Sequence, residues 1–216
     1  MFEKHHEKKL AEQYQHDLAH WQEMHESTAS ALSLAQSFTG ETSAQLILKS
    51  GEAVFATVTN AGLVEERRGA GHYVGGSSGV SIPIGSIGGH AVRYHVGATR
   101  GHYAQSPPVP TAIDQGTVFI TNQRVVFQGT KQTRECAFAK LIGFEHTNDG
   151  ATVFSVSNRQ KPTIIHYGTQ IAGWFNFRLD LALAHFKGTV PDLVAQLQAQ
   201  MAQVDAAQPQ PPAPAT

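Results

Sequence analysis

The sequence contains one cysteine, Cys136, in 216 residues. A single thiol excludes an internal disulfide and a cysteine-built zinc site, and it is typical of a reducing compartment. No histidine adjoins Cys136, which favours a buried structural thiol. Arg134 lies two residues away, so a reactive thiol remains the alternative. Long apolar runs are also missing: no stretch of about 18 apolar residues occurs, and the first residues lack the apolar core of a signal peptide. We therefore expect neither secretion nor membrane spanning.

An excess of charge of either sign is missing too. The 16 Lys and Arg residues and 17 Asp and Glu residues give a formal net charge of -1. No overall field therefore attracts a polyanion, and we expect no binding to nucleic acid. Any contact with a phosphate group must then be local.

Glycine and proline are absent from residues 3–36, where apolar side chains recur at the three- and four-residue spacing of a helix face. Ser27 or Thr28 could cap a second helix, so one long helix and two collinear helices are both possible. This arm, residues 1–38, would fold back on its own domain, dock on a partner, or pair with another copy as a coiled coil. Its poor heptad pattern disfavours the coiled coil.

Short β-branched and aromatic runs, separated by turn residues, follow from residue 45. Their spacing of about 8–12 residues predicts an antiparallel barrel or sandwich. Turn residues predict breaks at 60–62 and 106–110. Residues 69–89 hold eight glycines, which indicates a long, partly ordered connection or, alternatively, a close-packed turn. The expected strands cover 46–48, 53–58, 63–64, 91–96, 117–121, 124–128, 134–138, 141–145, 152–157 and 163–167.

The last expected element is a helix that starts at Thr189, with Pro191 early and Asp192 in its first turn. Residues 174–179 would lead into it. Its apolar stripe needs a sheet to cover it and consists of Leu193, Leu197, Met201 and Val204. Residues 206–216, rich in Pro, Ala and Gln, cannot build a core, and we expect them to be disordered.

The run 116–129 contains a strand that ends in Thr121-Asn122 and leads through Arg124 into a second apolar strand. This hairpin resembles the signature hairpin of GRAM and bacterial pleckstrin-homology-like (PH-like) domains, and residues 48–52 are similar to the start of the same domains. The chain also resembles a type of actinobacterial or actinobacteriophage protein with this hairpin. Such a scaffold usually holds lipid headgroups, peptides or other proteins, although fold alone does not fix function.

The resemblance implies an α+β fold. We expect a mainly antiparallel PH/GRAM-like half-barrel over residues 45–205, with a Gly-rich insertion at about 69–110. An N-terminal helical arm would precede it, and the C-terminal helix would cap it. Thr121, Asn122 and Arg124 would form a structural hairpin, in which Arg124 bonds backbone carbonyls or a carboxylate such as Glu135.

Basic residues gather at the expected turns and could serve solubility alone. The functional alternative is a rim that holds anions, because side chains at hairpin tips converge and arginine grips phosphate through two parallel hydrogen bonds. The rim would consist of Arg67, Arg68, Lys131, Arg159 and Lys161.

Histidines suggest two further sites. His16 and His20 are four residues apart on the first helix, but no third metal ligand is dictated, so we expect no metal and no cofactor. A histidine cluster near the glycines could support acid–base or metal-dependent hydrolysis, yet no nucleophile motif accompanies it. That cluster comprises His72, His90, His95 and His102, followed by Asp114.

These patterns favour a binding module over an enzyme. We expect a cytoplasmic, non-enzymatic protein that acts on a protein partner or as a peripheral protein at an anionic membrane surface. The alternative is a metal-dependent or histidine-based hydrolase that uses the region from His72 to Asp114.

Overall fold

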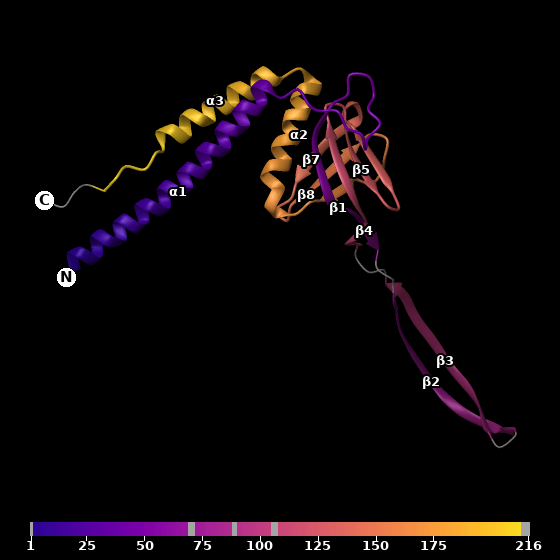
Figure 1. Ribbon diagram of the computed structural model, residues 1–216. Helices are drawn as coiled ribbons and strands as arrows, with labels where there is room; N and C mark the ends of the chain where they lie inside the picture. The colour runs from indigo at the N-terminus through magenta and orange to yellow at the C-terminus, as the bar shows by residue number, and fades with distance from the viewer. Residues whose placement is uncertain (1, 69–71, 88–89, 105–107, 213–216) are drawn as a thin grey trace. The chain divides into compact units, whose positions relative to one another are not determined.

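The computed structural model describes the backbone of residues 2–68, 72–87, 90–104 and 108–212, and the side chains of residues 9–67 and 109–212. Two compact units make up the chain, one formed by Met1–Leu63 with Asp114–Thr216 and the other by Val64–Ile113. The first unit contains three helices and most of a seven-stranded sheet, and the second contains a β-hairpin (Figure 1).

The N-terminal arm is one helix, α1 (Phe2–Ser37), which runs without a break through Ser27 and Thr28. Helix α3 (Val190–Ala206) packs along its C-terminal half, as Figure 1 shows. The indole Nε1 of Trp21 donates a hydrogen bond to the carbonyl oxygen of Val204 at 2.7 Å. The arm therefore folds back on its own chain.

The apolar stripe of α3 is covered by α1, so the expectation that a sheet would cover it is wrong. Leu197 is 8% exposed and Val204 is 5% exposed. Two amphipathic helices that lie side by side bury each other's stripe without a third layer.

Seven strands form one sheet in the order β6-β5-β4-β1-β9-β8-β7. The pairs β4–β5, β5–β6, β7–β8 and β8–β9 are antiparallel. In β8, Thr152, Phe154 and Val156 are buried and Ser155 is exposed, whereas the first four residues of β5, 124–127, are all buried. The strand bounds are β1 (Val54–Arg68), β4 (Pro108–Thr121), β5 (Arg124–Gly129), β6 (Thr133–Ala137), β7 (Leu141–His146), β8 (Ala151–Val156) and β9 (Thr163–His166).

The two edge strands of this sheet, β6 and β7, are consecutive in the chain. Only the short 3-10 helix Phe138–Lys140 joins them. A three-residue link cannot span a flat seven-stranded sheet, because neighbouring strands lie about 4.8 Å apart. The sheet must curve until its edges approach, and β6 accordingly comes into contact with β8. The α+β class and an open, curved sheet are thus confirmed.

The helix that covers the sheet is α2 (Ala172–Lys187), which was not predicted as an element separate from the final helix. Phe175, Leu179 and Leu181 are each 0% exposed. Gly188 ends α2 with a φ of 71°, in the left-handed region that favours glycine. The helix at 189–204 is therefore not the cap: α2 occupies that place, and α3 belongs to the helical pair.

Three strand predictions need correction. Residues 46–48 form a loop, and the break expected at 60–62 lies inside β1, where Asn60 has a φ of 59°. Asparagine tolerates this conformation better than most residues, so the strand continues. Of the break expected at 106–110, residues 108–110 begin β4, and the rest lies outside the described residues.

In the second unit, residues 72–87 of the glycine-rich segment form a strand in place of the expected connection, and the strand expected at 91–96 is confirmed as part of a longer one. The two strands are β2 (His72–Ile87) and β3 (His90–Ala104), which pair antiparallel from His72↔Ala104 to Ile87↔His90. The four histidines of the hydrolase alternative lie on these strands, and their side chains fall outside the described residues.

Candidate functional site

The Thr121-Asn122-Gln123-Arg124 turn between β4 and β5 binds the loop that precedes β1. Asn122 Oδ1 accepts a hydrogen bond from Ala53 N at 2.9 Å, and its Nδ2 donates to Gly51 O at 3.0 Å. Gln123 Nε2 donates to Ser50 O at 2.9 Å. The side chains of this turn therefore hold the backbone of residues 50–53 in place, just before β1 begins.

Arg124 forms the buried centre of this contact. Its Nε and Nη2 donate to the two carboxylate oxygens of Glu52 at 2.7 and 3.0 Å, and Nη2 also donates to Ile47 O at 2.9 Å. The Glu52 side chain is 0% exposed and that of Arg124 10%. Paired charges in such a place are retained only when their hydrogen bonds are satisfied.

Thr121 and the backbone complete the shell around Glu52. Thr121 Oγ1 and Lys49 N each donate to this carboxylate at 2.7 Å. Burial by itself would raise the pKa of Glu52, but the hydrogen bonds from Arg124, Lys49 N and Thr121 lower it below its usual value. Glu52 therefore stays ionised.

Glu135 extends the network to the surface. It accepts from Arg124 Nη1 at 2.7 Å and from Lys49 Nζ at 2.9 Å, and these bonds, Lys49 first, lower its pKa. The sequence suggested both partner types of Arg124, a backbone carbonyl and Glu135. From the sequence, Glu52 was not identified as a partner of Arg124, although the run 48–52, Leu-Lys-Ser-Gly-Glu, which contains this residue, was noted. We define Glu52, Thr121, Asn122, Arg124 and Glu135 as the hairpin clasp.

Asp114 has a comparable structural role. Its carboxylate accepts hydrogen bonds from Lys131 N at 2.9 Å, Gln132 N at 2.7 Å, Thr130 Oγ1 at 3.0 Å and Gln115 N at 2.9 Å. These bonds tie the turn between β5 and β6 to β4. Both oxygens of Asp114, the carboxylate named in the hydrolase alternative, thus accept hydrogen bonds within the fold.

The pKa of Asp114 leads to a pH prediction. Burial would raise it, but the bonds from Lys131, Gln132, Thr130 and Gln115 lower it to about 2, from 3.8. The ionised carboxylate therefore stabilises the fold above about pH 4, and this contribution is lost as the pH falls toward 2. We expect Asp114→Asn to lower the free energy of unfolding fully above pH 4 and progressively less between pH 4 and 2. Urea unfolding of both proteins at stepped pH measures this, and a difference that stays constant would contradict it.

The predicted rim is not brought together. Lys131 lies in the turn between β5 and β6, whereas Arg159 and Lys161 lie between β8 and β9. The latter connection meets the opposite end of the sheet, because Phe138 N bonds Gln123 O and Ser157 N bonds Lys140 O there. Arg159 also donates to Thr163 Oγ1 at 3.0 Å.

The other two rim residues, Arg67 and Arg68, end β1 in the second unit. The Arg67 side chain is exposed, and that of Arg68 lies outside the described residues. Hairpin tips converge only when the hairpins point the same way, which the sequence could not establish.

Two other candidate sites came from the sequence: the histidine pair His16 and His20, which lies on α1, and Cys136, which lies in the core. Among residues 9–67 and 109–212, no group of three or more His, Cys, Asp or Glu could hold a metal ion. Cys136 is 1% exposed, and burial raises the pKa of its thiol, as a structural cysteine requires.

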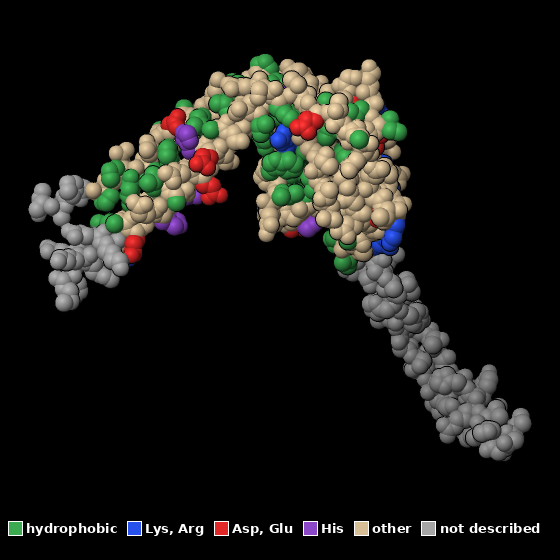
Figure 2. All heavy atoms as spheres, viewed as in Figure 1, with side chains coloured by type: hydrophobic (Ala, Val, Ile, Leu, Met, Phe, Trp, Pro, Cys, Tyr) green, Lys and Arg blue, Asp and Glu red, His purple; other side chains and the backbone are tan. Residues whose placement is uncertain are grey.

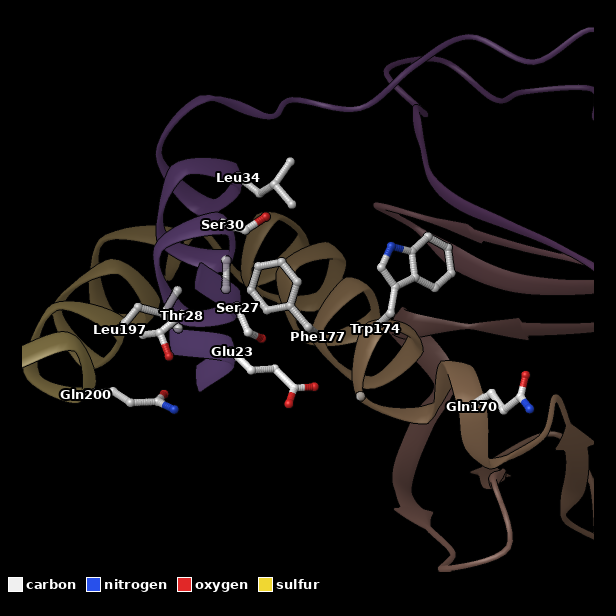
Figure 3. A pocket seen from close by; sticks show the side chains of 12 residues that line it. Glu23, Ser27, Thr28, Ser30, Leu34, Gln170, Trp174, Phe177, Leu197 and Gln200 are labelled. Carbon is white, nitrogen blue, oxygen red and sulfur yellow. The ribbon is translucent and has the colours of Figure 1, made fainter. Parts of the chain in front are cut away.

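A groove with a volume of about 570 Å³ lies between α2 and the α1–α3 pair (Figure 3). This volume falls in the range of about 300–1,000 Å³ that is usual for ligand pockets. Its α1 wall follows one helix face, because the lining residues recur at three- and four-residue spacing. The lining residues are Glu23, Ser27, Thr28, Ser30, Ala31 and Leu34 from α1, Leu197 and Gln200 from α3, and Gln170, Gly173, Trp174 and Phe177 from α2 and the turn before it.

Helix α2 presents aromatic side chains on two faces. Phe175 points into the core, where it stacks on Tyr167 at a centroid distance of 3.9 Å. Trp174 and Phe177, one turn apart, face the groove, and Figure 3 shows Phe177 pointing toward α1. Trp174 is 42% exposed. The sheet thus covers only one of the two apolar faces.

The position of α2 is fixed by polar contacts beneath it. Tyr167 OH donates to Asn176 Oδ1 at 3.0 Å and lies 2.9 Å from Thr152 Oγ1. His146 Nδ1 lies 2.8 Å from the same hydroxyl, and burial lowers the pKa of His146. This chain of bonds joins the first half of α2 to β7, to β8 and to Tyr167, the residue that follows β9.

Arg178 braces the aromatic wall of the groove. Its guanidinium carbon lies 4.7 Å from the Phe38 ring centroid and 5.5 Å from that of Trp174. Burial lowers the pKa of Arg178, with Glu41 opposing, and the face of an aromatic ring partly compensates a cation that leaves water. The Arg178 guanidinium therefore packs against both Phe38 and Trp174.

Charge is unevenly distributed along the chain. The helical pair, residues 2–37 and 190–206, has three basic and eight acidic residues, a net charge of -5 with histidine neutral, and six of the acidic residues lie in 9–37 and 190–206. Residues 38–189 have 13 basic and nine acidic residues. Figure 2 shows acidic side chains along the helical pair. Those six acidic residues are Glu12, Asp17, Glu23, Glu26, Asp192 and Asp205.

Comparison of the chain with protein-family models, with curated proteins and with solved structures finds no match. The resemblance to GRAM and PH-like domains therefore stays a prediction that rests on the hairpin residues. In the part of the chain that the structure describes, every helix is too short or too polar to cross a membrane.

Proposed function

We propose that the protein is a non-enzymatic binding module that holds a segment of a protein partner in the groove between α2 and the α1–α3 pair. Within the PH/GRAM-like interpretation of the fold, α2 is the capping helix and the helical pair is an addition to it. The groove forms where the two meet.

The observation that carries this proposal is the second apolar face of α2. The apolar face of a helix is normally covered by another element. Here Trp174 and Phe177 face a groove, and Trp174 stays 42% exposed. Tryptophan is enriched among the residues that dominate binding energy, and apolar surface beside a concave site marks interaction sites.

A protein partner is favoured over an anionic membrane surface because the basic residues are dispersed. Lys131 and the pair Arg159 and Lys161 lie at opposite ends of the sheet, so they do not form one anion-binding face. Exposed charges that act singly are screened within about 8 Å at physiological ionic strength.

The test is a selection of displayed 16-residue peptides on the intact protein, followed by affinity measurements on variants. We expect Trp174→Ala to weaken selected peptides at least tenfold, because loss of a central tryptophan typically costs 2 kcal/mol or more. Ile142→Ala is the matched control, since Ile142 is 73% exposed on β7 and outside the groove. Peptides that bind Trp174→Ala as well as the unchanged protein would contradict the proposal.

A further inference from the structure

The side chains that line the groove carry charge of one sign. Glu23 is the one charged residue among the lining residues that the structure describes, and it is exposed to solvent. The others are apolar or bear hydroxyl and amide groups, such as Ser27, Gln170 and Gln200. An occupant with a positive charge opposite Glu23 gains attraction, whereas a negative charge there meets repulsion.

Around the groove the two walls from the helical pair are acidic, whereas the third wall, α2, contributes the cation of Arg178, whose guanidinium carbon lies 5.5 Å from the Trp174 ring centroid. Two of its three walls belong to the helical pair, whose net charge is -5. Fields of this kind steer oppositely charged partners toward a site and disfavour partners of like charge. The charge complementarity therefore points to a basic occupant.

The backbone of the walls indicates the conformation of the occupant. All three walls are helices, whose N–H and C=O groups bond each other along most of their length. An extended segment would therefore find few backbone partners in the groove, and unpaired backbone groups are costly to bury. A helix satisfies its own backbone and can present apolar side chains at positions i, i+3 or i+4, and i+7.

We infer that the groove takes a basic amphipathic helix of a protein partner. Its apolar stripe packs on Trp174, Phe177 and Leu34, and a lysine or arginine on its border lies opposite Glu23. This inference rests on the proposed function and adds the charge and the conformation of the bound segment.

Three designed 16-residue helical peptides test it. The first has a Leu stripe with Lys on the polar face, the second has the same stripe with Glu in place of Lys, and the third scrambles the first so that the stripe is lost. Each is labelled and titrated with the intact protein at low ionic strength. We expect the first peptide to bind at least tenfold tighter than either of the others.

Two matched charge reversals separate groove contacts from general attraction. Glu23 and Glu26 are exposed acidic residues on α1, and only Glu23 lines the groove. We expect Glu23→Lys to weaken the first peptide about tenfold, since an attraction becomes a repulsion. Glu26→Lys changes the net charge equally and should weaken it less than threefold. Circular dichroism and urea unfolding verify that both variants fold.

The outcomes distinguish the inference from the proposed function. If the acidic peptide binds as tightly as the basic peptide, and Trp174→Ala weakens the binding of both, the groove binds peptides but the preference for a basic segment is overturned. If the first peptide binds Trp174→Ala unchanged, or if both reversals weaken it equally, it binds the acidic surface generally and the inference is overturned. If anionic vesicles bind the protein and Trp174→Ala abolishes this, the occupant is a membrane, and both claims are overturned.

Discussion

Replacing Arg124 by methionine is expected to lower the free energy of unfolding by about 3–5 kcal/mol, because it leaves a buried charge without its partner. The Glu52 side chain is 0% exposed and receives two of its hydrogen bonds from Arg124 at 2.7 and 3.0 Å. Methionine keeps much of the side-chain volume but donates no hydrogen bond. Urea unfolding at neutral pH measures the loss.

A second variant shows whether the loss comes from Glu52. The double change Glu52→Gln with Arg124→Met removes both charges, so it should be less destabilising than Arg124→Met alone. Lys161→Met is the control, since Lys161 is an exposed cation in a turn and should change stability by no more than about 0.5 kcal/mol. A loss below about 1 kcal/mol for Arg124→Met would show that the hairpin clasp does not hold the fold together.

Phe127→Ala is expected to cost about 3–5 kcal/mol, as large-to-small changes do in a close-packed core. Phe127 is 0% exposed on β5, opposite Val118 of β4. Its neighbour Gln128 points to the other face and is exposed. Gln128→Ala on the same strand is therefore the control, with an expected change within about 0.5 kcal/mol. A similar effect of the two changes would place Phe127 outside the core.

The strands from 117 onward were predictable because their signal is local. Short apolar runs bounded by polar turns mark β4, β5 and β8 directly in the sequence. Arg124 could also be recognised as structural from a local feature. Its place in the hairpin turn indicates that its side chain bonds nearby backbone carbonyls or a carboxylate. The partner Glu52 lies 72 residues away, and only the fold brings the two together.

The division of the C-terminal helices was harder to predict. Gly188, with Pro191 three residues later, marks the end of one helix and the start of another, but apolar residues continue on both sides of it. The apolar stripe of α3 could be covered by a sheet or by another helix, and the sequence does not distinguish the two. Its pairing with α1 follows from the direction in which α3 leaves Gly188, which no local pattern specifies.

The groove was beyond prediction because it is assembled from three helices. Trp174 and Phe177 look like core residues in the sequence, since Phe175 and Leu179 stand beside them. Only the position of the sheet decides which of these rings are buried. The structure does not bring the predicted basic rim together for the same reason: the turns at 131 and 159–161 both carry basic residues in the sequence but lie at opposite ends of the sheet.

The most direct test of the binding groove is an NMR titration of the two tryptophan indole N–H signals. Trp174 lines the groove, whereas the Trp21 indole is bonded to Val204 O at 2.7 Å within the helical pair. Trp21→Phe assigns the two signals. When the selected or designed basic helical peptide is added, the Trp174 signal should shift and saturate while the Trp21 signal stays in place. A Trp174 signal that does not move at saturating peptide would contradict binding in the groove.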